Sequence, residues 1–412
     1  MKNNNLKSIF TRVMFAAAAL ALISRFAIGQ TWVQQVSGTT NDLNAVYFLN
    51  VQTGFVVGNA GTILYTFNGG QAWLSINGVT ADDMHDVAFQ SATNGLIVGD
   101  NGKIFRSTNG GTIWVSVASG TTNNLETVSF GDGGMVYAAG RNGTILRSTN
   151  SGVSWSIVTT GTTRFRGSAA KTSTKAWIIG DGGVITASNN SGTSFTPQSS
   201  STGSDLHGIF MLNDLTGYAG GQNSTLLFTI NGGTNWASRN SGINQGVNGI
   251  YFSNANTGWA AGSNSGVFIT LNAGTTWAAE TGGLASELKD INFPDINRGW
   301  AVGVSGKIIY RAGTLGIIKQ SGITPDKFSL SQNYPNPFNP TTNIKFDVAE
   351  NGFVSMKVFD ITGKQVADLV NDNLSIGTYK VDWSANGLSS GIYFYTLKTD
   401  KFSETKRMML IK

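Results

Sequence analysis

The strongest constraint on the fold of this chain is a repeat with a period of about 41 residues. The segment FVVGNAGTILYTFNGGQAW, over 55–73, recurs as LIVGDNGKIFRSTNGGTIW and in five further variants. One glycine column advances in steps of 41, 41, 40, 41, 41 and 41: Gly58, Gly99, Gly140, Gly180, Gly221, Gly262 and Gly303. An aromatic column keeps the same spacing: Trp32, Trp73, Trp114, Trp155, Phe195, Trp236 and Trp277. Units of this length bury a core only by stacking on their neighbours.

Each repeat contains four short apolar runs. In the second copy they predict strands at 84–89, 95–98, 103–107 and 114–117. The turns at 99–102 and 109–111 hold Gly and Asn, which adopt positive φ at little cost. Only 12% of the residues are charged and 53 are Gly, so long charged helices are excluded and an all-β chain is indicated. Four strands per repeat are typical of a β-propeller blade, and the aromatic column is expected to pack between sheets.

The two ends of the repeat region complement each other. The first three strands occur in seven copies, but the seventh copy ends near Arg311 without its NGG turn and Trp. A lone strand at 31–36, containing Trp32, precedes the first copy. Pairing it with the last blade would close the ring and remove exposed sheet edges. The sequence therefore predicts a seven-bladed β-propeller over 30–311.

The repeat fails after Ala312, and a separate C-terminal module is expected. We interpret 312–327 as a linker, followed by a cluster of Pro335, Pro337 and Pro340. Alternating apolar runs at 343–348, 354–359, 377–383, 391–399 and 404–411 then predict a small Ig-like β-sandwich over 328–412.

The N-terminus has the pattern of a secretory signal peptide over 1–29. Lys2, Lys7 and Arg12 precede an apolar run at 13–23, which is too short to span a bilayer. This segment carries +4, whereas 30–321 holds 14 basic and 14 acidic side chains. Without a basic stripe we expect no nucleic-acid partner. The chain has no Cys, which excludes disulfides and thiolate sites.

Two family resemblances follow from these motifs. The segment STNGGTIW at 107–114 resembles the Asp-box of BNR repeats, with Asn109 in place of Asp, and the VGxxG turns resemble the propeller family of the photosystem II stability/assembly factor. Sialidase and xyloglucanase propellers are more distantly similar. The YPNPFNPTTNI segment at 334–344 and the DITG turn at 360–363 resemble the C-terminal sorting domain of type IX secretion substrates. That resemblance implies the type IX machinery as a partner and an extracellular or outer-membrane-surface location.

One column of the predicted inner strands is polar in every copy: Asn44, His85, Glu126, Arg166, His207, Asn248 and Lys289. We expect these side chains, with Arg141 and Arg164 beside them, to ring the mouth of a central channel. The turn glycines repeat one residue, but this column changes charge between blades. Ligand binding by this ring is therefore one hypothesis, and simple solvation of a wet channel mouth is the other.

The expected function is non-catalytic binding of an unknown protein or glycan by a monomer, without a cofactor or metal. His85 and His207 belong to blades on opposite sides of the ring, which separates the only histidines. One alternative is a polysaccharide-active glycoside hydrolase that pairs Glu126 with Asp83 or Asp86. The three arginines that bind the substrate carboxylate in sialidases should come from well-separated blades. Here Arg141, Arg164 and Arg166 cluster in blades three and four, which argues against sialidase activity. Another alternative is an assembly or stability factor for a membrane complex.

Overall fold

The computed structural model describes residues 32–412, except 265, 281–285, 297, 313–317, 321–324, 375, 386–387 and 412. The expected signal peptide lies outside the described residues. Within these residues the strands form nine four-stranded antiparallel sheets, seven in the repeat region and two in the C-terminal region. The all-β architecture, a seven-bladed propeller followed by a β-sandwich, is confirmed. No helix among the described residues is long and apolar enough to cross a bilayer.

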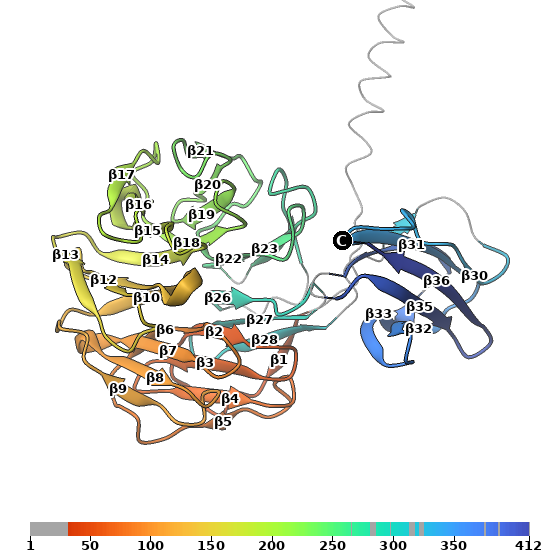
Figure 1. Ribbon diagram of the computed structural model, residues 1–412, viewed down its shortest axis with the longest axis horizontal. Helices are drawn as coiled ribbons and strands as arrows, with labels where there is room; N and C mark the ends of the chain where they lie inside the picture. The colour runs from red at the N-terminus through yellow and green to blue at the C-terminus, as the bar shows by residue number, and fades with distance from the viewer. Residues whose placement is uncertain are drawn as a thin grey trace, which may run out of the picture. The chain divides into compact units, whose positions relative to one another are not determined.

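Each sheet of the repeat region is one blade, numbered here by the order of its innermost strand. The inner strands are β2 (Leu43–Phe48), β6 (Met84–Phe89), β10 (Leu125–Phe130), β14 (Phe165–Ala170), β18 (Leu206–Met211), β22 (Val247–Phe252) and β26 (Leu288–Asn292). The second strands are β3 (Gly54–Gly58), β7 (Gly95–Gly99), β11 (Val136–Gly140), β15 (Ala176–Gly180), β19 (Gly217–Gly221), β23 (Gly258–Gly262) and β27 (Arg298–Gly303). Inner-strand labels gather at the middle of the propeller in Figure 1.

The outer half of each blade carries the turn signature of the repeat. The third strands are β4 (Ile63–Thr66), β8 (Ile104–Ser107), β12 (Ile145–Ser148), β16 (Ile185–Ser188), β20 (Leu226–Thr229), β24 (Val267–Thr270) and β28 (Ile308–Ala312). The outer strands are β5 (Leu74–Ser75), β9 (Val115–Val117), β13 (Ser156–Thr159), β17 (Thr196–Gln198), β21 (Ala237–Ser238), β25 (Ala278–Ala279) and β1 (Trp32–Gln35). Short 3₁₀ turns follow two second strands, at Asp100–Gly102 after β7 and Asp181–Gly183 after β15. A third, Asp132–Gly134, follows the inner strand β10.

Aromatic stacking joins consecutive blades. Second strands β3, β7, β11, β15, β19 and β23 are buried along their whole length, since they have a strand on each side and a neighbouring blade on each face. Phe48 of blade one stacks on Trp300 of blade seven with ring centroids 3.6 Å apart. Phe252 of blade six likewise stacks on Tyr218 of blade five at 4.1 Å. The tryptophan column meets these pairs edge-on, as Trp73 does with Phe48, so its predicted packing between sheets is confirmed.

Blades one to six share one hydrogen-bonded turn between the third and the outer strand. In blade two the Ser107 hydroxyl donates to Asn109 Oδ1 at 2.9 Å and accepts the Gly111 N–H at 2.8 Å. Asn109 Oδ1 also accepts the Ile113 N–H at 3.0 Å. The same hydroxyl–amide pair recurs as Thr66/Asn68, Ser148/Asn150, Ser188/Asn190, Thr229/Asn231 and Thr270/Asn272. The Asn side chain therefore stabilises this turn at the position where the Asp-box has Asp.

Blade seven is completed by the N-terminal strand, as predicted. β1 pairs antiparallel with β28, with Trp32 opposite Arg311. Arg311 occupies the position that holds Ser or Thr in the other six third strands. Its fully buried guanidinium contacts the Glu280 carboxylate through Nη2 at 2.9 Å, and Trp32 Nε1 donates to the same carboxylate at 2.9 Å. We call Glu280, Arg311 and Trp32 the closing cluster.

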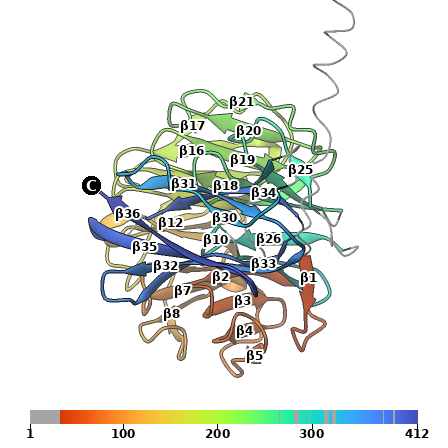
Figure 2. The same ribbon diagram turned by 90° about the vertical axis from the view of Figure 1, so that its right-hand side faces the viewer.

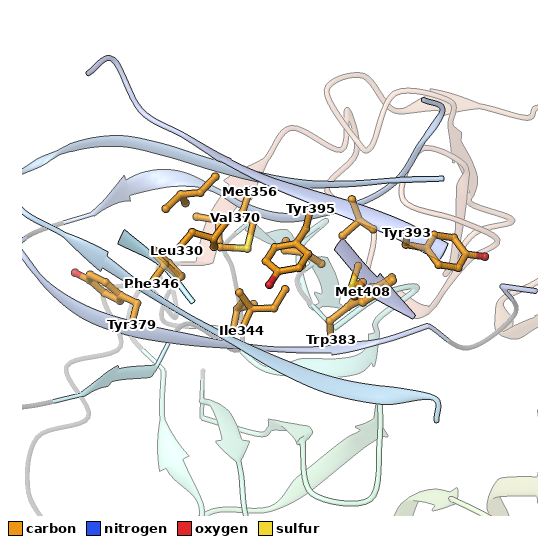
Figure 3. Packing of buried hydrophobic residues seen from close by; sticks show 14 of the residues in the cluster. Leu330, Ile344, Phe346, Met356, Val370, Tyr379, Trp383, Tyr393, Tyr395 and Met408 are labelled. Atoms are coloured by element: carbon orange, nitrogen blue, oxygen red, sulfur yellow. The ribbon is translucent and has the colours of Figure 1, made fainter. Parts of the chain in front are cut away.

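The C-terminal region is a sandwich of two sheets. One has the order β29 (Ile318–Gln320), β34 (Gly377–Ser384), β31 (Thr341–Val348), β30 (Ser329–Leu330), and the other β33 (Gln365–Leu374), β32 (Gly352–Asp360), β35 (Gly391–Lys398), β36 (Ser403–Leu410). Figure 2 shows β32, β35 and β36 as neighbouring strands. Apolar side chains from both sheets fill the space between them, including Ile344, Tyr395 and Met408 (Figure 3).

The proline-rich motif has a structural role in this sandwich. Buried Asn333 donates to Pro335 O and Thr342 Oγ1, both at 3.0 Å. Phe338 donates its backbone N–H to Met409 O at 2.9 Å, so the motif contacts the last strand. The predicted linker over 312–327 needs a correction, because its residues 318–320 form β29, which adds to β34 at the sheet edge. Strands β29, β30 and β33 were not foreseen.

Candidate functional site

The predicted polar column lies at a distinctive backbone position. In every inner strand the pairing register shifts between the first and the third residue, as between Met84 and Asp86. The column residue is the extra residue of a β-bulge in each blade. A bulge bends the strand locally and redirects a side chain away from the regular alternation. We call the seven bulge residues the inner-strand ring: Asn44, His85, Glu126, Arg166, His207, Asn248 and Lys289.

All seven ring side chains are half-buried, so each combines fixed contacts with access to solvent. Lys289 Nζ bridges blades seven and one by donating to Asn44 Oδ1 at 2.9 Å and Asp42 Oδ2 at 3.1 Å. Asn44 in turn donates to Met84 O of blade two at 2.8 Å. On the other side of the ring, His207 Nδ1 bonds Asn248 Oδ1 at 2.8 Å. Contacts between neighbouring blades therefore hold these side chains in place.

Two arginines meet Glu126 at the joint of blades three and four. The Glu126 carboxylate accepts from Arg141 Nε at 2.9 Å and from Arg164 Nη2 at 2.8 Å. Burial opposes ionisation of Glu126, but the bonds from Arg164 and Arg141 outweigh it and hold the pKa of Glu126 below its ordinary value. The side chain of Arg141 stays 48% exposed. Glu126 thus orients two guanidinium groups whose remaining N–H donors are available to an acceptor.

Arg166 adds a third guanidinium group at the next joint, between blades four and five. Its Nε donates to Asp181, and its Nη2 lies 3.9 Å from Asp205 Oδ2. We call Arg141, Arg164 and Arg166 the arginine side of the ring. On the neighbouring blade, burial and then the charge of Arg166 lower the pKa of His207, against the bond from Asn248. This His therefore stays neutral near pH 7.

The residues that precede the inner strands serve the turns between blades. Asp83 Oδ1 accepts the N–H of Ala60 in blade one at 2.8 Å, and Asp205 Oδ1 accepts the N–H of Gly182 in blade four at 2.8 Å. Asp42 does the same for Ser305 at 2.9 Å. At the joint of blades three and four this position is Arg164, which reaches Glu126 instead. The contact of Arg164 with Glu126 thus replaces the repeated aspartate contact at this joint.

The residue directly after each ring residue contacts the inner strand of a neighbouring blade. Asp86 Oδ2 accepts the Val128 N–H of the next inner strand at 2.8 Å, and Asp290 Oδ2 accepts the Val46 N–H at 2.9 Å. Burial raises the pKa of Asp86 to about 7 and that of Asp290 to about 6. Glycines hold this position in blades four to six. A Cβ on Gly167 would come within 2.6 Å of the next blade's backbone.

These contacts bear on the two chemical alternatives. For a glycoside hydrolase, the proposed carboxylates all have structural partners: Glu126 is held ionised, Asp83 binds a turn N–H, and Asp86 joins two inner strands. For a metal site, His85 and His207 lie on β6 and β18, and His85 Nε2 bonds Asp100 at 2.7 Å. Within the described residues, no three His, Asp or Glu side chains form a group that could hold a metal ion.

Two parts of the sequence match protein-family profiles. Residues 332–412 match the secretion system C-terminal sorting domain, and residues 73–197 match photosynthesis system II assembly factor YCF48. The chain joins a YCF48-like propeller to a type IX sorting domain. A sorting domain of this class directs export to the cell surface or outer membrane. None of the curated proteins matches the sequence.

Solved propellers resemble the YCF48-like propeller in fold. "YCF48 bound to D1 peptide" has a TM-score of 0.59 and 20% identity, covering 68% of this chain and 94% of that chain. "YCF48 from Cyanidioschyzon merolae" has a TM-score of 0.59 and 18% identity, covering 68% and 99%. The WD40 propeller domain of Doa1 has a TM-score of 0.57 and 13% identity, covering 68% and 97%. At these identities the likeness concerns the fold alone.

Sequence reasoning found the ring residues of the YCF48-like propeller but missed two features. The β-bulges could not be predicted, because a bulge is defined by the register of two paired strands and the sequence shows only the polar residue at that position. The closing cluster did leave a mark, since Arg311 breaks the Ser/Thr column and Glu280 stands three residues after Trp277 in the aromatic column.

Proposed function

We propose that this protein is an exported, non-catalytic binding module that holds an extended protein segment at the inner-strand ring. The observation that carries the proposal is the bulge in all seven inner strands, which presents polar side chains of five types, Asn, His, Glu, Arg and Lys, at one backbone position. A purely structural column would be expected to repeat one residue type, as the turn hydroxyls, all Ser or Thr, do. Varied charges around one ring favour orientation and selection of a polar partner.

The arginine side of the ring supports a protein segment over a neutral glycan. Arg141, Arg164 and Arg166 offer planar N–H donors that suit carboxylate and carbonyl oxygens. Glu126 fixes two of them in advance, which lowers the entropy that binding must cost. A solved propeller of the same fold is described as bound to a peptide. We therefore expect the bound segment to place acidic side chains or a terminal carboxylate beside these arginines.

A binding screen with the full chain tests this proposal. The probes are an array of ten-residue peptides that vary in net charge and an array of neutral and acidic glycans. Compared variants are Arg141→Gln/Arg166→Gln and the control Lys175→Gln, which removes a charge in the turn between β14 and β15 of blade four. We expect acidic peptides to bind, with affinity reduced about tenfold or more by the double substitution and unchanged by the control.

The outcomes separate the alternatives. Equal binding by both variants, or no peptide binding, would exclude the arginine side as the recognition surface. Binding to glycans alone would replace the protein ligand by a saccharide. Mass spectrometry of the bound probe after incubation reports on catalysis, and cleavage of the probe would contradict a purely binding role.

A further inference from the structure

The two outward faces of the sorting domain differ in chemistry. The sheet that contains β31 and β34 presents only polar side chains from these two strands, and four of them form two contacts with one another. Lys380 Nζ lies 3.0 Å from Asp382 Oδ1, and the Thr378 hydroxyl donates to Asp347 Oδ1 at 2.6 Å. We call this surface the polar face: Asn343, Lys345, Asp347, Thr378, Lys380 and Asp382. Lys380 and Asp347 thus have partners within the sheet, whereas Lys345 lies opposite Lys380 in the strand pairing.

The opposite sheet exposes aromatic rings and cations. Along β32 and β35, residues such as Met356 and Tyr395 point into the core, so the alternate residues point outward. Phe353 is 44% exposed, which is unusual for a large ring on a solvent-facing sheet surface. We call this surface the aromatic face: Phe353, Ser355, Lys357, Phe359, Phe394, Thr396, Lys398 and Arg407.

A groove with a volume of about 470 Å³ runs over the aromatic face. Its lining comes from β32, β35 and the turn that follows β35: Phe353, Ser355, Lys357, Phe359, Thr396, Lys398, Thr399 and Asp400. Both contributing strands are central in their sheet and have a hydrogen-bonded neighbour on each side. A partner therefore cannot add as a further strand here and must be recognised by side chains.

Two carboxylates lie near the cations of this face: Asp368 is opposite Lys357 in the pairing of β32 with β33, and Asp400 lines the groove. Among the residues that the structure describes, Lys357, Lys398 and Arg407 form no ion pair. Elsewhere in the domain, Lys401 pairs with Glu350 at 2.9 Å and Lys406 with Glu404 at 3.0 Å. Unpaired cations beside an apolar floor complement a partner that carries carboxylates next to an apolar side chain.

We propose that the aromatic face is the surface by which the secretion machinery holds the sorting domain, and that the machinery inserts an acidic, partly apolar protein segment into the groove. The phenylalanines would cover the apolar side chain of that segment. Lys357 and Lys398 would contact its carboxylates. The polar face takes no part, because the outward side chains of β31 and β34 include no aromatic ring that could cover an apolar side chain. This site is independent of the binding function proposed for the propeller.

Export of the full chain from a bacterium with type IX secretion provides the test. The variant Lys357→Glu/Lys398→Glu reverses both groove charges. Lys345→Glu/Lys380→Glu makes the same change on the polar face and is the matched control. Phe353→Ser removes the exposed ring without touching charge. Thermal unfolding of each purified chain checks that the sandwich is folded. We expect export of the groove variant to fall about tenfold or more, with periplasmic accumulation, and export of the control to match the parent.

Every outcome decides the proposal. Reduced export of both the groove variant and Phe353→Ser, with normal melting and a normal control, supports it. Equal export of groove and control variants, whether high or low, overturns it. Purified lipopolysaccharide is a second probe: if the groove variant loses lipopolysaccharide binding but exports normally, the face binds an anionic saccharide surface and the proposed protein partner is wrong.

Discussion

Blades one to six and blade seven solve the same problem with different chemistry. In the first six, a hydroxyl and an amide two residues apart close the turn to the outer strand, as Ser107 and Asn109 do. In blade seven the outer strand comes from the other end of the propeller, and no local turn can fix it. Arg311 replaces the hydroxyl and meets Glu280 and Trp32 in a fully buried cluster.

The difference shows that the sequence separation between two paired strands determines which interactions are needed to hold them together. A turn between adjacent strands requires only to be held in shape, because the chain already keeps its strands close. The joint between β1 and β28 must pair residues up to 279 positions apart, as Trp32 and Arg311 are, and fix one register. A buried ion pair with several hydrogen bonds is costly to mispair, which makes it suited to specifying register.

Removal of one member of the closing cluster should have the largest effect. Glu280→Ala leaves the Arg311 charge buried without its carboxylate, so we expect a loss of about 3 to 5 kcal/mol in the free energy of unfolding. Urea denaturation followed by tryptophan fluorescence measures it. The double variant Glu280→Leu/Arg311→Met removes both charges and should recover most of that loss. A single-variant loss below about 1 kcal/mol would show that the cluster does not stabilise the closed ring.

The next largest effect should be the pH dependence of the free energy of unfolding, which depends on the carboxylates that join neighbouring inner strands. Burial raises the pKa values of Asp86 and Asp290 to about 7 and about 6, whereas the unfolded chain loses these protons near pH 4. Between these values the folded state binds more protons, so stability should fall as the pH rises from 5 to 8. The slope is about 1 kcal/mol per pH unit for each carboxylate below its folded pKa.

Denaturation curves at half-unit pH steps check this slope. Asp86→Asn should remove the part that extends to about pH 7. Asp290→Asn should remove the part below about pH 6 and also lower the pKa of Asp86, which burial and the Asp290 charge both raise. Burial lowers the pKa of His207, so its contribution has the opposite sign and appears only below about pH 6.5. A flat profile from pH 6.5 to 8 in the parent chain would contradict the role of Asp86.

A single local turn should matter less. Ser107→Ala removes the acceptor of the Gly111 N–H and one donor to Asn109, so we expect a loss of about 1 kcal/mol. Ser116→Ala, on the exposed outer strand of the same blade, is the matched control and should change little. If Ser107→Ala costs as much as Glu280→Ala, the contrast between local and long-range joints fails.

The inner-strand ring should contribute least to stability. Arg166 is 23% exposed and pairs with Asp181 at the solvent boundary, so Arg166→Gln should change the free energy of unfolding by less than about 1 kcal/mol. The same variant should weaken peptide binding. Thermal melting beside the binding assay separates the two effects, and a large loss of stability would place Arg166 in the framework.

The parts of the molecule that repeat could be predicted from the sequence, because each blade needs the same turns and the same core. The glycine and tryptophan columns predicted seven blades. The lone strand that contains Trp32 and the incomplete seventh repeat, which ends near Arg311, predicted that these two segments pair. The polar column located the ring residues. Their bonding partners could not be predicted, since the choice of Arg164 for Glu126 depends on distances between blades. The added strand β29 was missed because three residues carry too little periodicity.

The pairing of β1 with β28 also sets an order of events during synthesis. Trp32 of the strand that completes the last blade leaves the ribosome first, and its partner Arg311 follows 279 residues later. At about 5 to 20 residues per second, that interval lasts roughly 15 to 55 seconds. Throughout it the nascent propeller has one unpaired strand at its beginning and an open sheet edge at its growing end. A chain that stops before Arg311 can therefore never become a ring, and both of its open edges are substrates for proteases and for aggregation.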